Sequence, residues 1–136
     1  MIVCPFDYGD YRSDLNLLIC RPEGKLTADQ MNDVAICREC IESKGLVQVN
    51  RFHDLRAITS IDLRFEDVRR ICETEVQLRM SEPPITACYL VPNPLLYGTI
   101  RMYKALIESR GVDVHVSYEV ENLAGILGVE KTDLVP

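Results

Sequence analysis

The sequence has no uninterrupted apolar run near the roughly 20 residues that a helix needs to cross a bilayer. Residues 1–11 also lack the basic start and the apolar stretch of a secretory signal peptide. We therefore expect a cytoplasmic protein with no transmembrane segment. Internal repeats, low-complexity segments and interdomain linkers are missing as well, so residues 1–136 are expected to form one domain.

Basic residues are outnumbered, with 15 Lys and Arg against 21 Asp and Glu, which gives a net charge of −6. Nonspecific binding to nucleic acid or to an anionic membrane surface needs a basic field. The composition therefore argues against a nucleic-acid partner.

The sequence shows no catalytic constellation, metal cluster or phosphate-binding loop, and we expect no cofactor and no metal. Its six cysteines are expected to be reduced and mostly buried, as in other cytosolic chains. Cys37 and Cys40 form a C-x-x-C pair, but they fall in the middle of a predicted helix, whereas redox pairs use a helix N-terminus. A zinc site would need a second such pair. A structural role is favoured, and a redox or metal role stays open.

The clearest elements form a strand, a helix and a second strand. Ile85–Val91 is an uncharged run typical of a strand buried on both faces. Asn93 and Pro94 predict a helix start, and Gly111 predicts its end. Residues 112–117 alternate valine with polar residues, which is the period of a strand with one exposed face.

The rest of the chain continues this alternation of strands and helices. We expect an α/β domain with a mainly parallel sheet of four to five strands, flanked by about four helices. Residues 1–14 are interpreted as an irregular or edge segment, and residues 130–136 as a frayed tail. The other expected elements are strands at Leu15–Cys20 and Leu46–Leu55, a helix from the capping box at Thr27–Gln30 to Lys44, a loop at Arg56–Asp62, and helices at Leu63–Met80 and Glu121–Leu127.

For the helix Leu63–Met80, Asp62 is the expected cap. Its predicted inner face carries Phe65, Val68, Cys72 and Val76, and the acid-before-base pairs that begin at Glu66 and Glu75 are expected to lie in solvent.

Two stretches resemble a known family. Residues 97–106 read YGTIRMYKAL and are followed by GVDV and a short closing helix, which resembles the C-terminal half of SpoIIAA-like proteins of the STAS/SEC14-like group. The resemblance implies a small α/β domain, often a dimer, that binds a protein or an apolar ligand such as a lipid.

The second stretch, Asp54 to Asp62, is similar to the segment after the central strand of anti-sigma factor antagonists. In that family the matching Asp is followed by a phosphorylated Ser, but Asp62 is followed by Leu63. The phosphorylation switch is therefore not carried over. Thr59 and Ser60 lie nearby, and loop hydroxyls of this kind more often serve as caps than as phosphate acceptors.

Ligands of open parallel sheets collect beyond the carboxyl ends of the strands. Polar residues predicted near those ends are candidates for ligand or partner contact, although structural roles such as capping compete with this interpretation. The candidates are His53, Asp54, Asn93, Tyr97, Arg101 and Tyr118.

Three functions follow from these features. The favoured one is a noncatalytic interaction or regulatory domain that forms homodimers, with the small-residue stripe of Gly98, Met102 and Ala105 as candidate dimer contact. The first alternative is a carrier of an apolar ligand, because the helix 95–110 has a wide apolar face. The second is a small-molecule enzyme that uses His53 and Asp54, although no nucleophile and base are paired in the sequence.

Overall fold

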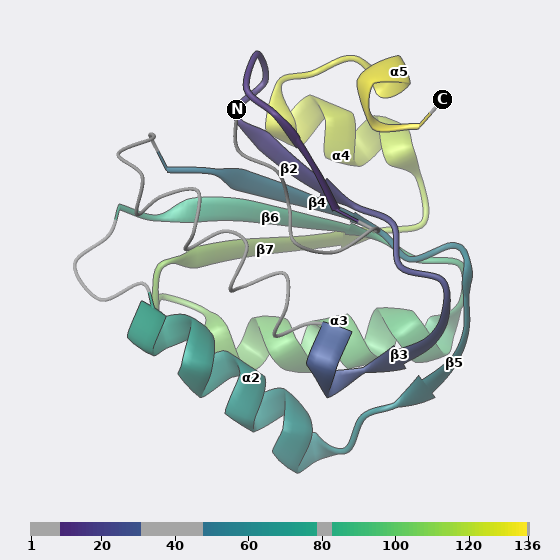
Figure 1. Ribbon diagram of the computed structural model, residues 1–136, viewed down its shortest axis with the longest axis vertical. Helices are drawn as coiled ribbons and strands as arrows, with labels where there is room; N and C mark the ends of the chain where they lie inside the picture. The colour runs from purple at the N-terminus through teal and green to yellow at the C-terminus, as the bar shows by residue number, and fades with distance from the viewer. Residues whose placement is uncertain (1–8, 31–47, 79–82, 136) are drawn as a thin grey trace.

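Five strands form one sheet in the order β1-β2-β4-β6-β7 in the computed structural model, which describes residues 9–30, 48–78 and 83–135 (Figure 1). β1 pairs antiparallel with β2, and all the other pairs are parallel. The expected α/β class with a mainly parallel sheet is confirmed. The strands are β1 (Gly9–Arg12), β2 (Leu17–Cys20), β4 (Asn50–Asp54), β6 (Ile85–Leu90) and β7 (Val112–Ser117).

Helices cover both faces of this sheet (Figure 1). On one face lie α2 (Phe65–Leu78) and α3 (Pro94–Ile107), beside a small parallel pair of β3 (Gly24–Thr27) and β5 (Ile58–Asp62). On the other face lie α4 (Val120–Leu127) and α5 (Lys131–Leu134). Each face has its own hydrophobic core, because alternate residues of the central strands point to opposite sides.

The start of α3 follows from local chemistry, as predicted, but the helix ends at Ile107, before the Gly111 that was expected to end it. The Asn93 side chain accepts a hydrogen bond from the Leu96 amide at 3.0 Å, and Pro94 occupies the first turn. After the helix, Gly111 adopts a φ of 99°, a left-handed value that favours glycine. Between these ends Leu96, Ile100, Tyr103 and Ile107 are buried, which confirms most of the expected apolar stripe.

The Thr27–Gln30 capping box is also confirmed, because each residue's side chain bonds to the other's backbone amide at 3.4 Å. The body of the helix expected from here to Lys44 lies outside the described residues. So does the Cys37–Cys40 pair. Three other cysteines, Cys20, Cys72 and Cys88, are buried, as expected.

The segment after β4 differs from the prediction. Residues 56–62 were expected to form a loop, but Ile58–Asp62 is the strand β5, paired with β3. Asp62 therefore belongs to a strand, and α2 begins only at Phe65, so Asp62 is not its cap. The pairing could not be read locally, because the residues that β5 bonds lie more than 30 positions earlier.

The faces of α2 also differ in part from the prediction. Val68 and Cys72 are buried as expected, but Phe65 is 51% exposed. Glu75, expected in solvent, is only 1% exposed.

The chain end is ordered where a frayed tail was expected. Residues 131–134 form α5, and Leu134 is completely buried against the α4 side of the sheet. The side chain of Arg21 also donates a hydrogen bond to the Leu134 carbonyl. These contacts hold the last turn in place.

Candidate functional site

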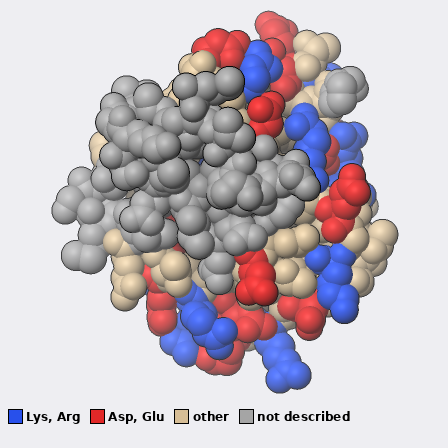
Figure 2. Space-filling model, viewed as in Figure 1, with Lys and Arg blue, Asp and Glu red and all other residues tan. Residues whose placement is uncertain are grey.

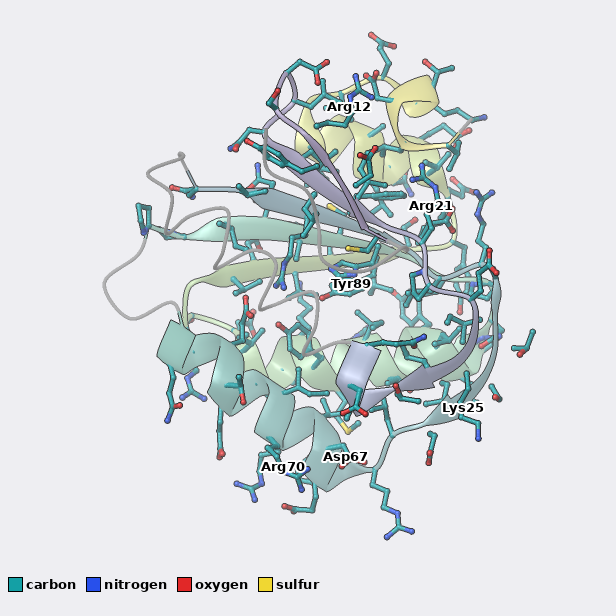
Figure 3. All side chains as sticks on the ribbon, viewed as in Figure 1. Arg12, Arg21, Lys25, Asp67, Arg70 and Tyr89 are labelled. Atoms are coloured by element: carbon teal, nitrogen blue, oxygen red, sulfur yellow. The ribbon has the colours of Figure 1, made fainter. Side chains whose placement is uncertain are left out.

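His53 and Asp54 close β4 but do not form one site. They are neighbours in a strand, so their side chains point to opposite faces of the sheet. His53 lies on the α2 and α3 side, where its ring stacks on Tyr89 with the ring centroids 4.4 Å apart. Tyr89 extends from β6 into the space between the sheet and α3 (Figure 3).

Asp54 is held by two arginines at the other face. Its carboxylate accepts bonds from the Arg56 guanidinium at 2.8 and 2.9 Å and from the Arg56 amide at 3.1 Å. Arg21 adds an ion pair at 3.9 Å. Burial works to raise the pKa of Asp54, but these bonds and charges outweigh it and lower that pKa. The carboxylate thus stabilises the turn after β4.

Asn93 is occupied as the cap of α3. Replacing Asn93 with alanine should lower the free energy of unfolding by about 1 kcal/mol, because the Leu96 amide loses its acceptor. Thermal or chemical denaturation followed by circular dichroism measures this. The matched Asn93→Ser variant keeps an acceptor and should unfold close to the original protein; an equal loss in both variants would contradict the capping role.

Three of the predicted residues do come together, at the edge of the sheet beside β7. The rings of Tyr97 and Tyr118 stack with their centroids 5.0 Å apart, and Arg101 lies one turn along α3 from Tyr97. Tyr97 and Arg101 line an open hollow of about 470 Å³ between α3 and α4, which we call the β7 groove. The β7 groove is lined by Tyr97, Arg101, Lys104, His115, Val116, Ser117, Asn122, Leu123 and Ile126.

The β7 groove carries cations that are only partly neutralised. Arg101 is exposed and has no ion pair with any residue that the structure describes. On α2, in contrast, Arg69 is paired with Glu66 and Glu73 at 2.6 and 2.8 Å, and acidic and basic side chains are mixed on the face in view (Figure 2). A locally basic edge on an acidic chain is suited to contact with another molecule.

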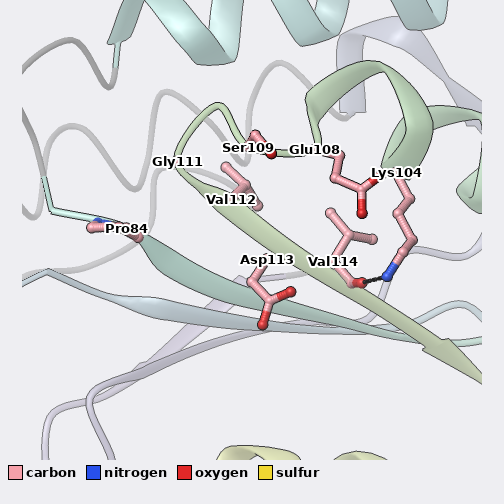
Figure 4. A pocket seen from close by; sticks show the side chains of 8 residues that line it. All are labelled: Pro84, Lys104, Glu108, Ser109, Gly111, Val112, Asp113 and Val114. Atoms are coloured by element: carbon pink, nitrogen blue, oxygen red, sulfur yellow. Dashed lines mark hydrogen bonds between the residues drawn. The ribbon is translucent and has the colours of Figure 1, made fainter.

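Lys104 and His115 also line the groove, and sequence reasoning did not select them. Lys104 Nζ donates a hydrogen bond to the Val114 carbonyl at 2.8 Å, across the edge of β7 (Figure 4). His115 Nε2 lies 2.8 Å from the Asp113 carboxylate. The alternation of Asp113, His115 and Ser117 along the strand was the signal that they share one face.

A buried polar cluster was also missed, and we call it the Arg51 cluster. Arg51 Nη2 lies 3.1 Å from Glu75 Oε1, with both side chains at 4% exposure or less, and the Tyr103 hydroxyl bonds to the same guanidinium. Burial disfavours the charge of Arg51, but Glu75 together with Tyr89 and Tyr103 outweighs it, and the pKa of Arg51 is raised. The cluster consists of Arg51, His53, Glu75, Tyr89 and Tyr103.

Within the Arg51 cluster, the imidazole of His53 is held in its neutral form. Burial and then the neighbouring charge of Arg51 hold the pKa of His53 well below its usual range. Its Nε2 has no hydrogen-bond partner among residues 9–30, 48–78 and 83–135. Burial also raises the pKa of Tyr89, to about 12. The cluster is therefore built to be closed to solvent, and its groups are poor candidates for proton transfer with a bound molecule.

The predicted dimer stripe lies on the outer surface of α3. Gly98 and Ala105 are exposed, whereas Met102 is half-buried against the core. A Cβ atom added at Gly98 would meet nothing within 4 Å. The stripe thus leaves room for another molecule.

Within the described ranges, no group of three or more His, Cys, Asp or Glu side chains could hold a metal ion. Nor does any described helix have the length and apolar character that a membrane span requires. Neither a scan against protein-family models nor a search of curated proteins finds a match to this chain.

Proposed function

We propose that this chain is a noncatalytic, STAS-like interaction domain that forms homodimers. The β7 groove is the observation that carries the proposal. It is lined by Tyr97, whose ring stacks on Tyr118, and by Arg101, which has no ion pair among the described residues. Aromatic and arginine side chains are the groups most enriched at protein interfaces.

The alternatives have less support. For an enzyme, His53 and Asp54 would have to act together, but they point to opposite faces and are enclosed by Tyr89 and Arg56. For an apolar carrier, the wide apolar face of α3 would have to line a ligand cavity. Leu96, Ile100, Tyr103 and Ile107 instead pack into the core against the sheet.

Sedimentation velocity over roughly 1 to 100 µM protein tests the dimer, because a stable pair buries about 800 Å² on each partner. We expect a shift from monomer to dimer within this range. A monomer at every concentration would contradict the homodimer. Native mass spectrometry of the same material addresses the carrier: a bound lipid that survives purification would favour the carrier over the interaction domain.

Gly98 offers a separate prediction. Gly98→Ala should raise the free energy of unfolding by about 0.5–1 kcal/mol, because glycine is unfavourable inside a helix and the new methyl group meets open space. Chemical denaturation measures this gain.

If a second molecule approaches closely at the small-residue stripe, Gly98→Leu should abolish the dimer. If the Gly98→Leu variant dimerises with the same affinity as the original protein, the dimer contact does not involve this stripe.

A further inference from the structure

β7 is the last strand of the sheet within the part of the chain that the structure describes, so one of its edges has no neighbouring strand. On its paired edge, the Ile85 amide donates to the Gly111 carbonyl and the Val91 amide donates to the Ser117 carbonyl. Alternate residues of a parallel strand bond to the same neighbour. Odd-numbered residues from 111 to 117 therefore direct their backbone groups toward β6, and residues 112, 114 and 116 direct theirs outward.

We infer that the open edge of β7 binds the same edge of a second copy, in an antiparallel register centred on Val114. This inference rests on the homodimer of the proposed function and names its surface. Residues 112 and 116 lie two positions to either side of Val114. A second copy related by a two-fold axis at Val114 therefore places its residue 116 opposite residue 112 and its Val114 opposite Val114, so that outward-facing backbone groups meet. Three amides on each strand then form about six backbone hydrogen bonds between the copies.

The side chains favour this register over its neighbours. A register centred on Asp113 would set two carboxylates directly opposite each other, and like charges in that position are destabilising. A register centred on His115 would set two imidazoles opposite each other. Centred on Val114, Asp113 lies opposite His115 of the second copy, and this favourable pair occurs twice.

The flank of α3 has the same symmetry. Lys104 reaches the strand at Val114, the centre of the proposed pairing (Figure 4). Arg101 and Glu108 lie about one turn to either side of Lys104 along α3. A second copy turned about Val114 therefore brings its Glu108 to the level of Arg101. The surface is thus complementary to itself in charge, which distinguishes a second copy from an unrelated acidic peptide.

The position of Lys104 over the outward edge of β7 is consistent with the proposed strand pairing. A lysine over an edge strand discourages unselective strand pairing, and here it covers one of the outward carbonyls. In the proposed dimer the amide of the second copy's Val114 replaces that bond, and the two Lys104 side chains, which lie at the same level, turn away from each other toward Glu108 of the other copy. Strand pairing over six residues is small, so side chains of the β7 groove such as Tyr97 and Ile126 are needed to complete the contact.

A pair of charge variants tests the register, measured by sedimentation velocity on the full chain. Asp113→Lys removes the carboxylate that faces His115 of the second copy, and His115→Glu sets two carboxylates opposite each other, so each variant alone should dimerise about tenfold more weakly. Their equimolar mixture should recover the original affinity. In the mixed dimer the introduced lysine faces the introduced glutamate, and the remaining Asp113 faces the remaining His115.

Two further variants separate the pairing from folding. Val116→Pro removes an outward amide at an edge position, where proline is tolerated within a strand, so the monomer should fold but associate about tenfold more weakly. Glu73→Lys on α2 changes the charge of an exposed residue and should leave association unchanged. Circular dichroism confirms that each variant is folded.

The outcomes distinguish this inference from the proposed function. A dimer whose affinity ignores the β7 variants, or a mixture that stays monomeric when the original protein dimerises, overturns the β7 register but leaves the homodimer standing. A chain that remains monomeric up to about 100 µM overturns both.

Discussion

Glu75→Ala should lower the free energy of unfolding by about 3–5 kcal/mol, because it leaves the charge of Arg51 buried without its partner. The ion pair joins β4 to α2 across the core, where neither side chain can reach water. Urea denaturation followed by circular dichroism is the suitable measurement, since the chain contains no tryptophan as a fluorescence probe.

Two control variants sharpen this result. Glu73→Ala removes an exposed carboxylate from the same helix, so it should change the free energy of unfolding by at most about 0.5 kcal/mol. The double variant Arg51→Met, Glu75→Leu removes both charges and fills similar space, and it should unfold near the original value or above it. A loss below about 1 kcal/mol for Glu75→Ala would mean that the pair is not desolvated.

The second large effect is a loss of stability in mild acid that depends on His53. In the unfolded chain this histidine takes up a proton near its ordinary pKa of about 6.5, whereas the folded protein binds that proton only at lower pH. The unfolded state therefore binds more protons in this range, and stability rises with pH. As the pH falls below 6.5, the free energy of unfolding should decrease by about 1.4 kcal/mol per unit until the folded pKa is reached.

His53→Phe is the matched variant, because it keeps a ring to stack on Tyr89 but cannot bind a proton. The difference in unfolding free energy between the original protein and the His53→Phe variant should therefore change with pH by the same amount of about 1.4 kcal/mol per unit below about pH 6.5. His115 is present in both, so its contribution cancels in that difference. Above about pH 4.5 Asp54 also stays charged in both proteins. Because its pKa is lowered, protonation of Asp54 destabilises the folded protein only in more acidic solutions. Parallel pH curves would contradict an enclosed, neutral His53.

The unit of β6, α3 and β7 was predictable because its signals are local. Asn93 caps the helix through a bond to Leu96, three residues away, and Gly111 ends the connection with a conformation that suits glycine. The uncharged strand before the helix reflects burial on both faces. The rule that ligand contacts gather at strand ends also led to Tyr97, Arg101 and Tyr118, which do meet.

The polar interior was not predictable in the same way. Glu75 occupies a position that continues the buried face of α2 through Val68, Ile71 and Cys72, at three- and four-residue steps. That spacing predicts that Glu75 faces the core, whereas its charged side chain predicts that it is exposed to solvent. Its partner, Arg51, lies 24 positions earlier, and only packing α2 against the sheet brings the two charges together.

By itself, the amino-acid sequence determined the α/β class, the start of α3 and the strand periods, because each depends on residues within one or two turns of one another. Only the tertiary structure decided that His53 faces the core, that β5 pairs with β3, that Leu134 anchors the chain end and that β7 is the last strand of the sheet among the described residues. These features depend on contacts between segments far apart in the chain, and their free energy arises only when the layers pack together.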